Sequence, residues 1–341
     1  MRTLAITALL MLWASVAAAQ TITTEVDMSA GYSTEDVSAA ATQIRVFGQV
    51  FGGVRFFGEA AWGARYFPVA RPESATDVFG AAYPYENRAQ VIEAYGERIF
   101  KPGAGLVGLR AGRFRTPFGI YNQSDHAYSG FLRAPMIRYD DYYALSNSYV
   151  EHGADLIVGA PQAYIEASLG APADVSETRR RSGLDTVIRG QGYYRSVIAG
   201  VSFYRAMPYQ PASFAKGHAV FTGVDVRWMQ SGVQVRGEFI TGQPFDGTTT
   251  TGGYVDLLVH RVAMGPVTAV ARLERLDYDT PSPFFLFARR AMAGTRIRIA
   301  GGLTAQIAAG HQWGQQIQRD RTALDLALTY SLRRDVETHR P

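Results

Sequence analysis

The chain contains no cysteine, and only two of its 341 residues are lysine, Lys101 and Lys216. Without cysteine, neither a disulfide framework nor a thiolate metal site is possible. Beyond the first twenty residues, no stretch approaches the roughly 18 consecutive apolar residues that suggest a membrane-spanning helix. No linker rich in proline or serine and no block of like charges divides the chain, so we treat it as a single domain.

The first residues have the features of an export signal. Met1-Arg2 gives a charged start, residues 4–18 are apolar, and Ala17-Ala18-Ala19 offers a cleavage site of small residues. The apolar run is shorter than the ~20 residues of a spanning helix, which argues against an uncleaved anchor. We therefore expect residues 1–19 to be a signal peptide. Cleavage would remove Arg2 and lower the formal net charge from +4 by one.

Apolar and charged residues alternate along most of the remaining chain. In the segment 54–67, Val54 and Trp62 share one face of a strand, whereas Arg55 and Glu59 share the other. A charged side chain that faces lipid near the membrane midplane costs about 2–4 kcal/mol, so the charged face must line a polar lumen. An ordinary half-buried sheet would fit any single strand. No remaining segment, however, could cover so much apolar sheet.

The links between these strands are sorted by length. Short links rich in glycine, proline or serine alternate with longer segments, the longest being 116–148. Short periplasmic turns and longer extracellular loops are typical of outer-membrane barrels. We predict an all-β transmembrane antiparallel barrel over residues 20–332, with residues 333–341 as a periplasmic tail. The expected strands number sixteen, with fourteen or eighteen as alternatives: 22–32, 41–51, 54–67, 88–100, 105–115, 149–159, 162–170, 183–192, 196–206, 216–229, 232–241, 253–264, 267–278, 288–300, 303–313 and 322–332.

The segment Gly112-Arg113-Phe114-Arg115-Thr116-Pro117-Phe118-Gly119 resembles the phosphate-selective porin O/P family and its porin-like relatives. The segments 223–239 and 271–278 resemble the same family. This resemblance implies a sixteen-stranded porin, commonly a homotrimer, whose third loop folds inward and narrows the lumen. Phosphate-selective members also carry lysines near the constriction, and this chain has no lysine cluster.

The polar faces of the strands supply candidate pore-lining residues of both signs. Inward arginines are expected at 55, 65, 110, 189, 227, 236, 272, 290, 296 and 298, and inward acids at 59, 151, 155, 166, 185, 225, 238, 274 and 325. In the long loop, Arg115, Arg133 and Arg138 are expected to face Asp125, Asp140 and Asp141, with His126 as a further titratable group. The principal solute-contacting candidates are Arg110, Arg115, Asp125, His126, Arg133, Arg138, Asp140, Asp141, Arg227, Arg236, Glu238, Arg272, Glu274, Arg296 and Arg298.

These features favour a passive outer-membrane porin for small anionic or neutral hydrophilic solutes, with a weak preference for anions. Its other partners would be outer-membrane lipid and further copies of itself, and no cofactor or metal is expected. The guanidinium group suits oxyanions, although a GC-rich genome would produce the same excess of arginine. A barrel hydrolase using Ser124-Asp125-His126 and a plugged structural or adhesive barrel are the alternatives. The excess positive charge forms no basic stripe, so nucleic acid is not an expected partner.

Overall fold

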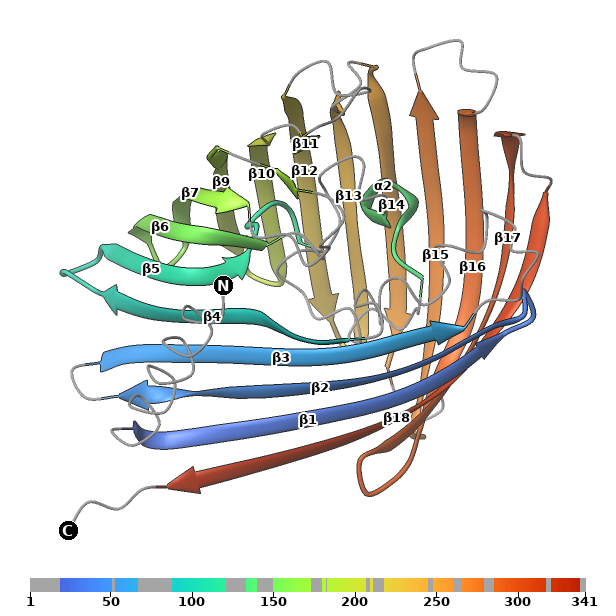
Figure 1. Ribbon diagram of the computed structural model, residues 1–341, viewed down its shortest axis with the longest axis horizontal. Helices are drawn as coiled ribbons and strands as arrows, with labels where there is room; N and C mark the ends of the chain where they lie inside the picture. Colours follow the sequence, from blue (N-terminus) through green and yellow to red (C-terminus); the bar gives the residue numbers. More distant parts are fainter. Residues whose placement is uncertain are drawn as a thin grey trace.

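The computed structural model describes residues 19–50, 53–66, 88–120, 133–139, 150–172, 180–181, 183–206, 209–210, 218–244, 248–260, 265–278, 285–316 and 320–337. Its strands form a closed antiparallel barrel, with β1 hydrogen-bonded to β18 (Figure 1). Every other barrel strand pairs with its neighbours along the chain. Closure leaves no sheet edge, which a barrel needs in lipid because no water is available there to satisfy free backbone groups.

Sixteen strands make up the barrel, as the sequence predicted. They are β1 (Ala19–Ser33), β2 (Val37–Val50), β3 (Val54–Tyr66), β4 (Arg88–Phe100), β5 (Leu106–Arg115), β6 (Val150–Ala160), β7 (Ala163–Pro172), β9 (Asp185–Tyr194), β10 (Val197–Ala206), β12 (Ala219–Gln230), β13 (Val233–Gln243), β14 (Thr250–Val259), β15 (Val267–Tyr278), β16 (Phe285–Ala300), β17 (Leu303–Gln316) and β18 (Arg321–Glu337). Two short strands, β8 (Arg180–Arg181) and β11 (Tyr209–Gln210), form a separate two-stranded sheet that is not part of the barrel wall. One helical turn, α2 (Met136–Tyr139), belongs to the link between β5 and β6.

All the short links expected on the periplasmic side do fall at one end of the barrel. The link between β1 and β2 breaks the pattern, because it is a tight turn at the opposite end. We expected it to span 33–40, but it covers only residues 34–36, with Asp36 at a positive φ of 58°. Aspartate tolerates this left-handed conformation because its short polar side chain hydrogen-bonds locally. Both flanking strands therefore run longer than predicted.

The two faces of the wall differ as the alternation predicted. Large apolar side chains such as Leu273, Val224 and Leu328 are more than half exposed on the outside. Every arginine and carboxylate predicted to face inward occupies an inward position in the strand register. Two aromatic residues of the strands, Phe114 and Tyr204, point inward and are buried, although aromatic residues of membrane barrels often lie outside at the interfaces. Aromatic side chains are common at any strand position, so the residue type alone could not show which face they occupy.

The last strand continues past the point where we expected the barrel to end. β18 runs to Glu337, so residues 333–337 extend the strand that closes the barrel. They pair with residues 21–25 of β1, Arg333 binds Glu25 at 3.3 Å, and the Thr23 hydroxyl donates to Asp335 at 2.6 Å. The predicted tail at 333–341 was therefore wrong over its first five residues. The polar residues 333–337 could belong to a solvated tail, but in this barrel they pair with β1.

Shortening this strand is expected to weaken the closure of the barrel. A chain ending at Leu332 loses five cross-strand pairs with β1, which we expect to lower the free energy of unfolding by about 3 kcal/mol. The temperature at which the folded band disappears on electrophoresis would fall accordingly. A chain ending at Glu337 is the matched control and should behave as the full chain. Equal transition temperatures for the two truncated chains would contradict the role of residues 333–337.

Candidate pore lining

Strand register brings charges of opposite sign together on the inner wall from β3 to β7. Arg55 lies opposite Glu97, Glu97 opposite Arg110, and Arg110 opposite Asp155. The Arg110 guanidinium lies 3.0 Å from Glu97, 3.1 Å from Asp155 and 3.2 Å from Glu166. Opposite charges directly across a pair of strands stabilise a sheet, whereas like charges destabilise it. From Arg55 to Asp155 the inner wall is therefore a ladder of ion pairs.

One ion pair spans an intervening strand, because a glycine leaves room for it. Arg189 of β9 reaches across β10 and binds Asp225 of β12 at 2.6 and 3.0 Å. On β10 it also donates to the Ser202 hydroxyl at 2.8 Å. A Cβ added at Gly200 would lie 2.5 Å from Nη2 of Arg189 and 2.7 Å from Oδ2 of Asp225. Any side chain at position 200 would therefore occupy the space of the ion pair.

A second group of ion pairs lies on β13 to β16, deeply buried. The Asp256 carboxylate is shared by two arginines: Arg236 donates to it at 3.0 Å, and Arg272 donates at 2.6 and 2.9 Å. On the next strands, Arg290 binds Glu274 at 2.8 and 3.1 Å. Buried charges of this kind are tolerated only when they are paired and hydrogen-bonded.

The start of the long link between β5 and β6 contacts the inner wall on the side of β10 and β13. The amide of Gly119 donates to the Ser202 hydroxyl at 3.1 Å, and the amide of Ile120 donates to Glu238 at 2.8 Å. Both Ser202 and Glu238 occupy inward positions. The described residues 116–120 therefore enter the barrel, in agreement with an inward-folding loop.

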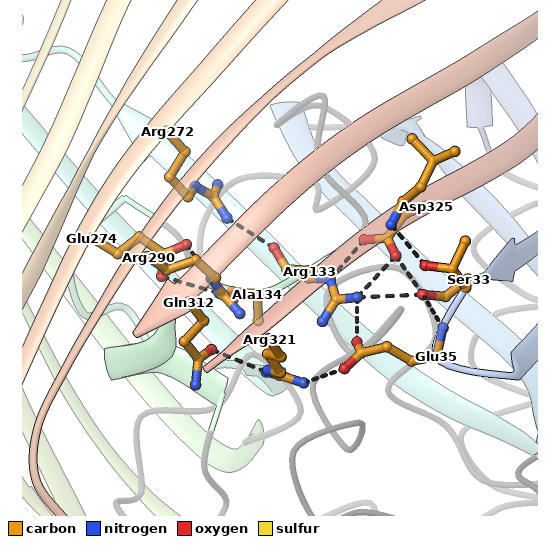
Figure 2. A network of polar contacts seen from close by, with 12 residues as sticks. Ser33, Glu35, Arg133, Ala134, Arg272, Glu274, Arg290, Gln312, Arg321 and Asp325 are labelled. Carbon is orange, nitrogen blue, oxygen red and sulfur yellow. Dashed lines mark hydrogen bonds and ion pairs between the residues drawn. The ribbon is translucent and has the colours of Figure 1, made fainter. Parts of the chain in front are cut away.

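The second described part of the link, residues 133–139, is anchored by Arg133 (Figure 2). Its guanidinium binds Asp325 of β18 at 2.6 and 2.9 Å and Glu35 of the first turn at 2.6 Å. Arg321 binds the other oxygen of Glu35 at 2.9 Å. Arg133 is almost fully buried, so this contact holds the loop against the wall near the closing strands.

Wall arginines also hold the backbone of this loop segment. Arg272 donates to the carbonyl of Arg133 at 2.8 Å, and Arg290 donates to the carbonyl of Ala134 at 2.7 Å (Figure 2). These are the arginines that bind Asp256 and Glu274, so each guanidinium serves a carboxylate and a loop carbonyl together. The five N–H donors of arginine make this possible, whereas lysine has three on a single atom.

Apolar side chains of the loop also pack against the inner wall. Glycines of the wall receive two of them: a Cβ at Gly223 would meet the Phe118 ring at 3.0 Å, and one at Gly252 would meet Ile137 at 3.1 Å. The buried cluster that results consists of Phe118, Ala134, Ile137, Val187, Tyr204, Ala206, Ala219, Phe221, Ile240, Tyr254, Leu276 and Ala288. The described loop segments are thus fixed by apolar packing as well as by ion pairs.

The loop residues predicted from the sequence are placed only in part. Arg115 and Arg133 bind carboxylates of the wall, which we did not foresee; Arg115 contacts Glu59 at 2.8 Å and also Glu93. Arg138 belongs to α2, but its side chain lies outside the described part of the molecule, as do Asp125, His126, Asp140 and Asp141. The predicted contacts among the charges of the loop stay a prediction for these five residues.

The predicted wall residues do lie together on the inner face. Arg110, Arg236, Glu238, Arg272 and Glu274 take part in the contacts described above. Of the others, Arg227 donates to Gln191 at 3.3 Å, and Arg296 and Arg298 occupy inward positions at the periplasmic end of β16, with Arg298 exposed.

Sequence reasoning missed several inward carboxylates, among them Asp256, Glu93 and Glu97. The signal for Asp256 was present, since it alternates with the outward residues Val255 and Leu257. Its neighbours on the inward face, Tyr254 and Leu258, are largely apolar, which hid the pattern. On β4 a register shift beside Glu93 interrupts the alternation, so period two fails there.

Comparison with solved structures finds the same architecture in bacterial porins. OmpF of Salmonella typhi, solved in complex with daunomycin, is 9% identical, with a TM-score of 0.60 over 92% of this chain and 98% of that chain. An anion-selective porin from Comamonas acidovorans is 10% identical, with a TM-score of 0.60 over 91% of this chain and 98% of that chain. OprB of Pseudomonas putida is 8% identical, with a TM-score of 0.61 over 92% and 93%.

At these identities the likeness shows a shared fold. No family model and no curated protein matches the chain. The fold, with an apolar outer face around a charged interior, is that of a bacterial outer-membrane barrel. The narrower resemblance to phosphate-selective porins stays a prediction.

The described part of the chain contains no cluster of three or more His, Asp or Glu side chains arranged to hold a metal ion. Among the same residues, no helix is long and apolar enough to cross a membrane.

A substitution at position 200 tests the ion-pair ladder. Gly200→Val should displace Arg189 from Asp225 and leave two buried charges unpaired, so we expect unfolding to become easier by about 3–5 kcal/mol. Denaturant unfolding followed by tryptophan fluorescence measures this. Gly190→Val is the control, because a Cβ there would meet only Val201, at an ordinary 3.6 Å. Similar losses for the two variants would show that the ion pair is not the cause.

Proposed function

We propose that the protein is a passive diffusion pore, or porin, of the bacterial outer membrane, for small hydrophilic solutes and ions. The observation that carries this proposal is the closed sixteen-stranded barrel whose inner face bears charges of both signs while its outer face is apolar. Charged walls keep a lumen wet, and rings of charge set the ion preference of pores. The inward loop segments would narrow the lumen.

The charges on the inner wall are distributed unevenly around the barrel. Strands β3–β7 and β13–β17 lie half a turn apart in the strand order. Among described side chains, the first group carries six inward carboxylates against four arginines: Glu59, Glu93, Glu97, Glu151, Asp155 and Glu166 against Arg55, Arg65, Arg110 and Arg115. The second group carries five arginines against three carboxylates: Arg236, Arg272, Arg290, Arg296 and Arg298 against Glu238, Asp256 and Glu274. Such an arrangement supports a field across the lumen that would orient dipolar solutes.

Preference for anions is a finer part of the proposal. Because Arg115 and Arg133 are engaged with wall carboxylates, they contribute less free positive charge than the sequence suggested. The support for a weak anion preference shifts to the periplasmic mouth, where the exposed Arg298 occupies an inward position. Assembly as a homotrimer is also part of the proposal; one solved neighbour, OmpT of Vibrio cholerae, is described as a trimer form.

A plugged barrel is the second candidate, and one observation favours it. The apolar cluster around Phe118 and Ile137 fills part of the interior with loop residues. A plugged barrel would share the whole wall and differ only in conductance. A barrel hydrolase, the remaining alternative, would use Ser124, Asp125 and His126, which lie outside the described residues.

Planar-bilayer recording of the purified, folded protein tests the proposed function. We expect stepwise conductance and, under a KCl gradient, a reversal potential that weakly favours chloride. Folded, heat-modifiable protein without any conductance would overturn the pore and favour the plugged barrel. Conductance that favours potassium would keep the pore and overturn the anion preference.

The arginines at the mouth give a sharper test of selectivity. Replacing Arg296 and Arg298 by Gln should bring the chloride-to-potassium permeability ratio close to one, because local positive charge raises the concentration of anions there. Arg334→Gln is the matched control; it removes an arginine at the periplasmic end of β18 from an outward position and should leave the ratio unchanged. An unaltered ratio in the double variant would exclude these arginines as its source.

The ion pair between Arg133 and Asp325 is expected to reduce fluctuations of the loop inside the pore. Asp325→Asn removes one charge of a buried pair, a change that typically costs about 3–5 kcal/mol, so the segment around Arg133 should detach more often. We expect noisier open-channel current in single-channel records. Asp27→Asn is the control, because Asp27 binds Arg45 on the neighbouring strand. Equal noise in both variants would argue against an anchoring role.

A further inference from the structure

Among the described residues, nearly all the charged side chains on the outer face of the barrel are positive. Among the described residues of the barrel strands, the outward positions hold six arginines, Arg98, Arg113, Arg205, Arg275, Arg289 and Arg334, but one carboxylate, Asp277. The inner face, in contrast, has nearly equal numbers of both signs. Lipid itself does not explain this bias, since carboxylates facing lipid are less costly than arginines.

The six arginines lie at the ends of their strands, where membrane interfaces are expected. Arg98 and Arg334 are at the periplasmic end, and the other four are at the extracellular end. At this level a charge costs only about 0–1 kcal/mol. The bias in sign therefore calls for something that attracts positive charge at the interface.

Two of the extracellular arginines face each other directly. Arg275 of β15 is the register partner of Arg289 of β16, and like charges in this position destabilise a sheet. Asp277 binds both, at 2.8 Å from Arg289, and neutralises one of the two charges. The pair keeps a net positive charge, and the side chain of Arg275 is 65% exposed.

Aromatic residues mark the same level. Trp313 of β17 is the register partner of Arg289 and is 40% exposed, and the Arg289 guanidinium lies 5.2 Å from the centre of the Phe287 ring. Exposed tryptophan at this position is typical of the membrane–water interface. Arg275 and Arg289 thus sit where lipid head groups lie.

We propose that Arg275 and Arg289 bind the phosphate of an anionic lipid in the outer leaflet. Guanidinium forks match phosphate oxygens in two parallel hydrogen bonds, and the bound anion would relieve the repulsion between the arginines. Asp277 ion-pairs with both guanidinium groups and so holds them close together. The proposal depends on the outer-membrane fold and is independent of the proposed pore function.

Thermal unfolding in detergent with added lipid A tests this proposal, using the full mature chain. Lipid A with both phosphates should raise the unfolding temperature, and lipid A with its phosphates removed should raise it much less. The double variant Arg275→Gln/Arg289→Gln should need at least about tenfold more lipid A for the same shift. Arg334→Gln, at the opposite end of the barrel, should respond as the unaltered protein.

Several results would overturn the proposal. Equal stabilisation by the dephosphorylated lipid, or an unchanged response of the double variant, would exclude phosphate recognition at these arginines. Stabilisation by inorganic phosphate alone to the same extent would indicate a site for free anions. A change of oligomeric mass in the double variant without lipid would make the pair a contact between protomers.

Two measures keep the test independent of folding and of pore function. Circular dichroism confirms that each variant folds, and the single variant Arg275→Gln, at the more exposed position, replaces the double variant should the latter fail to fold. Bilayer conductance is measured in parallel and should be unchanged by Arg275→Gln. Loss of lipid stabilisation with normal conductance separates the lipid site from the pore.

Discussion

The energetic difference between a charge that faces lipid and one that faces a polar interior determines the arrangement of this wall. Each strand has two faces, and a slip of one residue would move its whole charged set outward. Arg189, Arg236 and Arg272 illustrate the constraint: each occupies an inward position opposite a polar or acidic partner. Closure between β1 and β18 then gives the interior that these charges need.

The path of the loop depends on the same charges. Arg272 and Arg290 bind carboxylates of the wall and, with their remaining donors, the loop carbonyls of Arg133 and Ala134. A compact ammonium group could not serve both partners in this planar geometry. This requirement gives the preference for arginine over lysine a structural basis at these positions, beside any effect of genome composition.

The strands and their faces could be predicted because alternation is a local property. The sixteen strands and the inward positions of residues such as Arg110 and Glu274 follow from period two. The ends of elements were harder to predict. The extension of β18 to Glu337 depends on pairing between residues about 300 positions apart, such as Thr23 with Asp335. The tight turn at 34–36 closes locally, but Thr34 also accepts a hydrogen bond from the distant amide of Leu324.

The ion-pair partners of the candidate pore-lining residues could not be predicted from the sequence, for the same reason. Arg133 meets Asp325, 192 positions away, and nothing near Arg133 in the sequence indicates that carboxylate. Gly200 matters because of an arginine on one neighbouring strand and an aspartate on the other. Such contacts become visible only once the register of three strands is known.

The inside and the outside of the barrel treat arginine differently, and the comparison explains why the outer pair stands out. Inside, arginine meets carboxylates from neighbouring strands, so charge is balanced within the protein, as around Asp256. Outside, Arg275 and Arg289 share a single acid, and the protein leaves part of their charge uncompensated. A charge uncompensated by the protein at a membrane interface is most stable where the surroundings supply the opposite sign. The phosphates of head groups provide it at the level that Trp313 marks.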